Sequence, residues 1–234
     1  MRQTRLHDEI VERWGSEIGS GRRPADSRIV MEDAIEEFGA SRSAIREAVR
    51  VLESVGMVQS RQRVGITVTP VEQWSPYDSR VLRWRLEGPD RVALLRSLSE
   101  LRSAVEPLAA RLAAERATPE QCGALTAALV GMASTARAAS DDEYLAHDVD
   151  FHSVLLEASG NVMLTGLRTI VTSVLEGRTH HAMMPTTANA EALRLHGEVV
   201  AAVQAGDGDL AERSMRAIVT ESTAAISAMA EAAS

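Results

Sequence analysis

Residues 41–68 read SRSAIREAVRVLESVGMVQSRQRVGITV, and this stretch decides the fold of the first part of the chain. After Ser41, a good N-cap, apolar residues recur at helical spacing as far as Gly56, which predicts a helix with one buried face. Its other face carries Arg42, Arg46 and Arg50. Two short β-type runs follow around the basic turn 61–65, so we predict a recognition helix and a hairpin wing, as in a winged helix-turn-helix.

The charge distribution of the chain supports a nucleic-acid partner for this region. The net charge of the 234 residues is −8, but residues 1–70 carry 11 Arg against 11 acidic residues. Residues 41–65 alone contain five Arg and two Glu. This local surplus predicts a patch that faces phosphates, and because one such patch binds weakly, it also favours a dimer. The alternative is that the arginine row is only a solvated helix face.

The segments on either side complete the first domain. We predict helices at residues 5–19 and 31–38, with the wing closing at Pro70. Residues 70–89 contain three prolines and two of the three tryptophans of the chain. The segment 71–89 therefore differs in character from what precedes it. We interpret it as a linker that docks partly onto the second domain. The residues expected to make that contact are Trp74, Val81, Leu82 and Trp84, and the alternative role of the tryptophans is to fill a domain seam.

The remainder of the chain has no convincing strand, and its Gly and Pro residues fall where helices should end. The pattern predicts an all-α bundle over residues 90–234, after a DNA-binding domain at 1–70 and a linker at 71–89, so the fold class is mainly α. We expect six to seven helices in the bundle. The six that the pattern marks are 90–116 with Pro107 inside, 119–138, 142–159, 161–181, 188–205 and 209–232.

Three features of the predicted bundle could carry chemistry. Asp148 and His152 are four residues apart, so both lie on one helical face and could bind one ion. Apolar spacing turns His196 towards the interior, and Arg102 could face inward and hold a carboxylate with two nitrogens. The plain alternatives are a solvated Asp–His pair, a core histidine and a structural arginine.

Residues 4–69 resemble the DNA-binding domain of the GntR superfamily of bacterial transcription regulators. The resemblance rests on the Ser-Arg pair at 41–42, the Arg-Glu-Ala at 46–48 and the glycine-bearing wing. It implies that the recognition helix binds a double-stranded, pseudopalindromic DNA operator. By this resemblance the DNA contacts come from Arg42 and Arg46, the phosphate contacts from Ser41 and Ser43, and the wing from Arg63 and Gly65.

Residues 89–222 resemble the FCD effector domain of the FadR subfamily. The shared pattern is Leu-Arg-x-x-x-Glu-Pro at 101–107, Asp-x-x-x-His before Ser-Gly-Asn at 148–161, and Leu-His at 195–196. The resemblance implies a divalent metal ion on Asp148, His152 and His196, with Arg102 holding an organic acid. Zinc is the first expectation, with nickel or manganese as alternatives. Ile218 replaces a further histidine of the family, which leaves three protein ligands, and His180 and His181 match no motif position.

The linker is similar to that of the sugar-acid regulators in this family, such as galactonate repressors. We therefore expect a cytoplasmic, homodimeric repressor whose operator affinity is controlled by a small carboxylate effector, a sugar acid, with no membrane partner. Two alternatives stay open from the residues. One is a metal-sensing regulator, in which the ion is the signal. The other is a metalloenzyme with two histidines and one carboxylate, although no nucleophile or general base has a partner at motif spacing.

Overall fold

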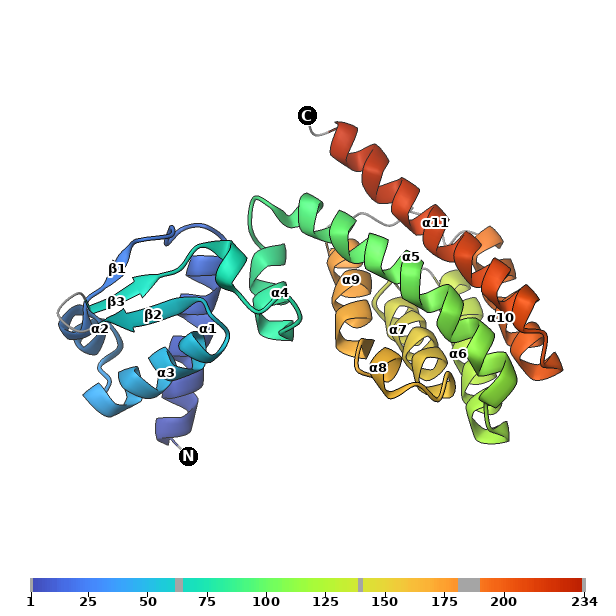
Figure 1. Ribbon diagram of the computed structural model, residues 1–234, viewed down its shortest axis with the longest axis horizontal. Helices are drawn as coiled ribbons and strands as arrows, with labels where there is room; N and C mark the ends of the chain where they lie inside the picture. The colour runs from blue at the N-terminus through green and yellow to red at the C-terminus, as the bar shows by residue number, and fades with distance from the viewer. Residues whose placement is uncertain (1, 62–64, 139–140, 181–189, 233–234) are drawn as a thin grey trace. The chain divides into compact units, whose positions relative to one another are not determined.

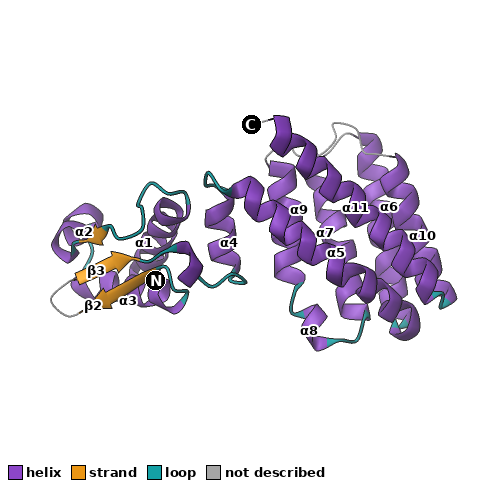
Figure 2. Ribbon diagram, turned by 45° about the horizontal axis from the view of Figure 1, so that its top comes forward, coloured by secondary structure: helices purple, strands orange, loops and turns teal. Residues whose placement is uncertain are grey.

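The computed structural model describes residues 2–61, 65–138, 141–180 and 190–232 (Figure 1). The chain divides into two compact units, Met1–Arg91 and Val92–Ser234. The first unit combines helices with a small sheet. The second unit has helices joined by loops and no strand among its described residues (Figure 2). No helix in the described ranges is long and apolar enough to cross a membrane.

The first unit has the elements that a winged helix-turn-helix requires. Its three strands pair antiparallel in the order β1-β3-β2, with Gln59 opposite Thr67 in the hairpin and Ile29 opposite Ile66 at the other edge. The short strand β1 was not predicted. In chain order the elements are α1 (Arg2–Gly19), β1 (Arg28–Ile29), α2 (Met31–Phe38), α3 (Arg42–Ser54), β2 (Val58–Arg61), β3 (Gly65–Val68), η1 (Val71–Gln73) and α4 (Ser79–Leu86).

The predicted recognition helix is α3, and the sequence explains both of its ends. Ser41 caps it, because its hydroxyl accepts a hydrogen bond of 3.2 Å from the Ala44 backbone N–H. After the helix, Gly56 has a φ of 78°. A side chain there would also overlap the backbone of Gln73, so this turn needs glycine. The buried face of α3 consists of Ala44, Ile45, Ala48, Val49 and Leu52.

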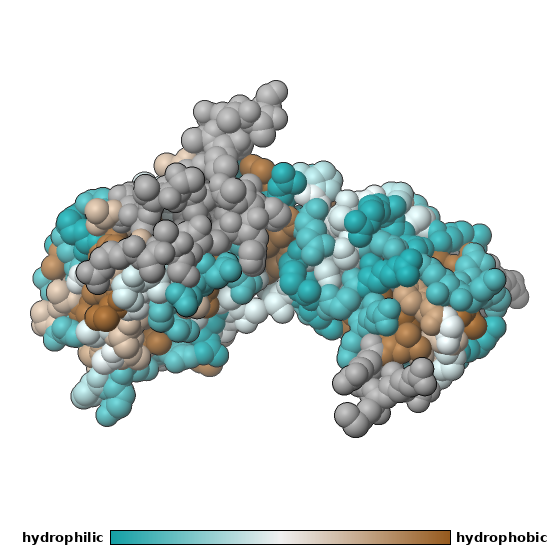
Figure 3. All heavy atoms as spheres, turned by 180° about the vertical axis from the view of Figure 1, so that it is seen from behind, coloured by the Kyte–Doolittle hydropathy of each residue, from teal (hydrophilic) through white to brown (hydrophobic). Residues whose placement is uncertain are grey.

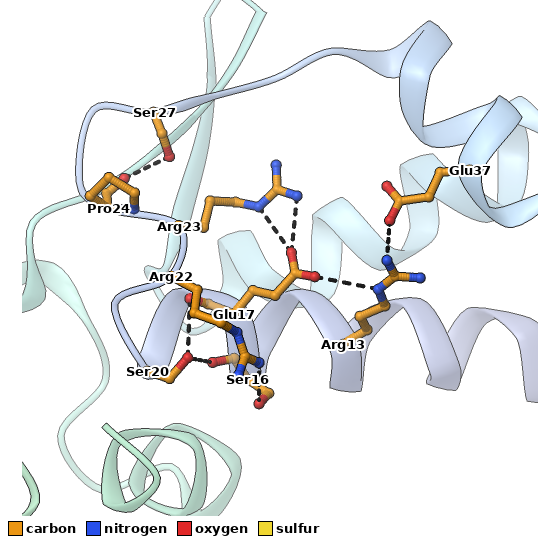
Figure 4. A network of polar contacts seen from close by, with 9 residues as sticks. All are labelled: Arg13, Ser16, Glu17, Ser20, Arg22, Arg23, Pro24, Ser27 and Glu37. Carbon is orange, nitrogen blue, oxygen red and sulfur yellow. Dashed lines mark hydrogen bonds and ion pairs between the residues drawn. The ribbon is translucent and has the colours of Figure 1, made fainter. Parts of the chain in front are cut away.

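A polar network fixes the end of α1 against its surroundings (Figure 4). The Glu17 carboxylate accepts hydrogen bonds from Arg13 on the same helix, at 3.3 Å, and from Arg23 in the following loop, at 3.2 and 3.0 Å. Arg13 also forms an ion pair with Glu37 of α2. The network therefore joins α1, α2 and the loop that leads to β1, and it supports the frame on which α3 is mounted.

The predicted linker lies within the first unit, which extends to Arg91. Val81 and Trp84 of α4 lie in the apolar core of the first unit, together with Ile10 and Trp14 of α1. Trp84 also donates a hydrogen bond of 3.0 Å from Nε1 to Glu12. The sequence did not predict α4, although Asp78 caps it by accepting from two backbone N–H groups.

The second unit is a helical bundle that largely follows the predicted pattern. The segment predicted as one helix from residue 161 is broken near Gly166 into α8 and α9. The first two residues of the helix predicted at 188–205 lie outside the described residues, as does His181. The elements are α5 (Arg91–Arg116), α6 (Pro119–Ala138), α7 (Asp141–Ala158), α8 (Val162–Thr165), α9 (Arg168–His180), α10 (Ala190–Ala205) and α11 (Gly208–Ala232).

Contacts between helices place the interior of this bundle. Helix α6 packs along α7, and α10 packs along both α6 and α11. The main apolar cluster contains Phe151 and Leu155 of α7 together with Val199 of α10 and Met215 of α11. Ile218 belongs to the same cluster. Polar side chains enclosed between these helices are therefore cut off from solvent.

The close packing of α4 on α1 can be tested by a substitution at their contact. A Cβ at Gly15 would overlap the Trp84 ring. We expect Gly15→Ala to destabilise the protein by about 1–3 kcal/mol, the usual cost of overpacking. Urea denaturation followed by tryptophan fluorescence measures the change.

Gly123→Ala is the matched control for that substitution, because Gly123 lies within α6 with open space where a Cβ would stand. This change should be neutral or stabilising by up to about 1 kcal/mol. Equal stability of the Gly15→Ala protein and the wild type would contradict the packing of α4 on α1.

Candidate functional site

The outer face of α3 presents the residues that the sequence assigned to DNA. Arg42, Ser43 and Arg46 are all exposed. Arg42 forms an ion pair of 2.8 Å with Glu32 of α2, in which both side chains are more than 60% exposed. Such an exposed pair contributes little stability, so a phosphate can replace Glu32 at low cost. Ser41 is also exposed, but its hydroxyl is the helix cap.

The hairpin is held against α3 at its base. The Glu53 carboxylate of α3 accepts a hydrogen bond of 2.8 Å from the Ser60 backbone N–H of β2. At the other end of the hairpin, Arg61 and Gly65 are exposed, and Gly65 has a φ of 93°. Arg63, the predicted wing residue, lies outside the described residues. Hydrophilic side chains cover most of the face of the first unit that Figure 3 shows.

In the second unit, the three predicted metal ligands converge in a buried position. Asp148 and His152 come from α7 and His196 from α10, and their ligand atoms lie within 4.8 Å of one another. Asp148 Oδ1 is 3.5 Å from His152 Nε2 and 3.3 Å from His196 Nε2. Among the described residues no other cluster of His, Cys, Asp or Glu has this geometry. The structure therefore brings together the three residues that the sequence predicted as metal ligands.

Neighbours outside the cluster orient both imidazole rings so that their Nε2 atoms face Asp148. His196 Nδ1 lies 2.7 Å from the Ala192 carbonyl, which can only accept, so Nδ1 donates to it and Nε2 faces Asp148. His152 Nδ1 lies 3.0 Å from Glu106 Oε2, which leaves its Nε2 on the side of Asp148. Metal-binding histidines are commonly oriented through their second nitrogen in this way.

The donor set also fits a metal ion because it is not satisfied within the protein. Asp148 Oδ1 and His196 Nε2 are buried and have no hydrogen-bond partner. Two imidazole nitrogens and one carboxylate oxygen suit zinc and similar divalent ions. Buried polar atoms are rarely left unpaired in folded proteins, so these two atoms are available to a ligand.

Arg102 and Glu106, one turn apart on α5, form an ion pair behind His152. Arg102 Nε is 2.7 Å and Nη2 is 3.2 Å from the two Glu106 oxygens, and both side chains are almost completely buried. Burial alone would raise the pKa of Glu106, but the charges of Arg102 and His152 offset it and hold that pKa at about 2. Glu106 is therefore ionised at all ordinary pH values.

The same acidic neighbours control His152. Burial lowers its pKa, but Glu106 and Asp148 offset that effect and raise the pKa to about 9 in the metal-free protein. Metal binding through Nε2 consequently requires a proton to leave the ring, and the affinity for metal should rise with pH.

Arg102, predicted to hold an effector carboxylate with two nitrogens, uses two of its three nitrogens on Glu106. Nη1 remains, buried and without a hydrogen-bond partner. Sequence reasoning missed the role of Glu106, although its spacing of four residues from Arg102 was a usable signal. His180 is the last residue of α9.

Two family profiles match this chain. The profile of the gntR family of bacterial regulatory proteins matches residues 6–68, and the profile of the FCD domain matches residues 97–221. The first range contains the exposed arginines of α3, and the second contains the histidine–aspartate cluster with its arginine. Together they account for both sites described above.

Individual relatives agree with these matches. The galactonate operon transcriptional repressor of Escherichia coli K12 is 31% identical over 218 residues, which cover 92% of this chain and 94% of that protein. The regulator LutR of Bacillus subtilis 168 is 31% identical over 207 residues, which cover 85% and 90%. The solved structure of Streptococcus agalactiae GntR matches 93% of this chain and 98% of its own, with a TM-score of 0.51 at 23% identity, and shows the same fold.

These relatives are transcription regulators and not enzymes, which removes the metalloenzyme alternative. The matching profiles, the recognition helix with its wing and the helical effector domain lead to one conclusion: this chain is a DNA-binding transcription regulator of the GntR family with a C-terminal FCD domain.

Proposed function

We propose that this regulator is a homodimeric repressor whose operator affinity is controlled by a small organic acid bound beside a divalent metal ion. The observation that carries the proposal is the buried cluster of Asp148, His152 and His196 with Arg102 next to it. This cluster combines a metal site with a cationic side chain that still has one unpaired nitrogen.

The DNA-binding half of the proposal rests on α3. A two-fold dimer would place two copies of this helix in successive major grooves of a pseudopalindromic operator. Arg42 and Arg46 are assigned to the base edges and backbone, Ser43 to a phosphate, and Ser41 to positioning the helix. Arg63 and Gly65 are assigned to the wing. The near-neutral first domain needs two such basic faces for strong binding.

The charge of the metal-loaded cluster favours an anionic effector. A histidine that binds a metal is neutral, so the charged groups are Arg102, Glu106, Asp148 and a divalent ion. Their charges add to one surplus positive charge in a buried place. Because a buried uncompensated charge is costly, a single carboxylate would stabilise the loaded site. The metal would supply a Lewis-acidic centre for the carboxylate and its α-hydroxyl.

The metal site and the relatives narrow the choice of metal ion and of effector. Three protein ligands leave at least one open position on zinc, the ion we assign first, with nickel or manganese as alternatives. The galactonate operon repressor of E. coli is similar to this chain over most of its length. We therefore assign the effector to the sugar acids and related hydroxy acids. A coupling of about 1–3 kcal/mol between the two domains would change operator affinity roughly 5- to 150-fold.

Substitution of Arg46 tests the DNA interface. Arg46 is exposed on α3 and forms no ion pair with another described residue, so its removal should leave the fold intact. We expect Arg46→Ala to weaken operator binding about 10- to 100-fold, the usual value of a good arginine contact. Fluorescence anisotropy with an operator selected by the wild-type protein from random duplexes measures this loss.

The control is Arg96→Ala, which removes an arginine that is also exposed, from α5. The control should bind operator like the wild type, and both variants should keep their affinity for zinc. Unchanged operator binding by Arg46→Ala would show that α3 is not the recognition helix.

Substitution of His196 tests the metal site. His196→Ala removes one of three ligands, so we expect zinc affinity to fall by at least the roughly 10- to 100-fold that loss of an outer-sphere partner causes. Zinc content after dialysis and calorimetric titration are the measurements. His7→Ala removes an imidazole from the first unit, outside the cluster, and should leave zinc binding unchanged. Equal zinc retention by the two variants would refute the assigned ligands.

A further inference from the structure

Two serine hydroxyls in the second unit are buried without a hydrogen-bond partner. They are Ser99 Oγ on α5 and Ser222 Oγ on α11, in residues that are 0% and 6% exposed. A helical serine or threonine normally satisfies its hydroxyl with a carbonyl of its own helix. Nearby residues of both helices do so, namely Ser97 and Ser103 on α5 and Thr220 and Thr223 on α11.

The register of the two helices places these serines at the same level of the bundle. Arg111 of α5 donates a hydrogen bond of 2.6 Å to Asp209 at the start of α11, and the two helices run side by side from that point (Figures 1 and 2). Ser99 lies 12 residues before Arg111, and Ser222 lies 13 residues after Asp209. Equal numbers of residues cover equal lengths of helix, so both hydroxyls stand at a similar height.

This level is adjacent to the metal centre. Ser99 precedes Arg102 by three residues, so both lie on one face of α5, about 4.5 Å apart along its axis. Arg102 is the residue whose Nη1 is also buried and unpaired, and its Nη2 lies 3.5 Å from His152 Nε2. Unpaired polar groups therefore occur at the metal ligands, at Arg102 and, one turn from Arg102, at Ser99, while Ser222 stands at the corresponding height of α11.

We infer that Ser99 and Ser222 form a hydroxyl-binding subsite that selects an acid with several hydroxyl groups. This inference rests on the proposed function and narrows its ligand. The acid's carboxylate and α-hydroxyl belong at the metal and Arg102 Nη1, while hydroxyls further along its chain pair with the serines. A serine hydroxyl both donates and accepts, so another hydroxyl is its natural partner.

The subsite favours a polyhydroxy acid over two other classes of acid. Lactate ends before a second hydroxyl, so it uses the metal end alone and gains nothing from the serines. A fatty acid would place methylene groups against the two hydroxyls and leave them unpaired, and sites built for hydrogen bonding reject such ligands strongly. The preferred effector is therefore a sugar acid of four or more carbons.

Calorimetry on the zinc-loaded, full-length protein tests the subsite with D-galactonate, D-gluconate and L-lactate as probes. We expect a hexonate to bind more tightly than lactate. Ser99→Ala and Ser222→Ala should each weaken that hexonate roughly 10-fold and leave lactate and zinc binding unchanged. Ser103→Ala is the matched control, because the Ser103 hydroxyl bonds to the Ser99 carbonyl of its own helix.

The outcomes separate this inference from the function on which it rests. Hexonate binding that is insensitive to both serine substitutions, or an equal loss for lactate, would overturn the subsite and leave the acid-controlled regulator standing. Failure of all three acids to bind the zinc-loaded protein would overturn both. Thermal unfolding of each variant shows that it is folded, and the retained lactate and zinc affinities provide a second check.

Discussion

A chain of buried ionisable groups, from Arg102 through Glu106 and His152 to Asp148 and His196, holds three helices of the second unit together. It connects α5, α7 and α10 through contacts of 2.7–3.5 Å. Charges removed from water are costly unless they compensate one another, so each member depends on the next. The three helices must consequently keep their relative positions around the cluster.

The first unit is stabilised differently, because apolar packing holds its helices together and its charged side chains lie in solvent. Trp14, Trp84 and the inner face of α3 form the core, while the arginines of α3 remain in solvent. Because α4 packs on α1 through Gly15 and bonds to Glu12, it moves as part of the DNA-binding unit. The effector domain follows this helix directly in the chain, so only a short segment connects the bundle to α4.

Much of this could be predicted from sequence because it depends on local signals. The cap at Ser41, the turn glycine at Gly56 and the helical spacing of apolar residues determined α3 without reference to the rest of the chain. The meeting of Asp148, His152 and His196 came from the family pattern. Helix α4 was missed because prolines and tryptophans around it resemble a linker, and because its packing depends on Gly15 and Gly19, which are distant in the sequence. The roles of Glu106, Ser99 and Ser222 were missed because an unpaired hydroxyl or a buried ion pair is a property of the packed bundle.

The most direct test of the account is operator binding measured by fluorescence anisotropy as D-galactonate or D-gluconate is added, with zinc-loaded protein and with chelator-treated protein. We expect one hexonate to lower the operator affinity of the zinc-loaded protein roughly 5- to 150-fold and to have no effect after chelation. An affinity that follows zinc concentration alone, with no response to any acid, would contradict it and show that the metal itself is the signal.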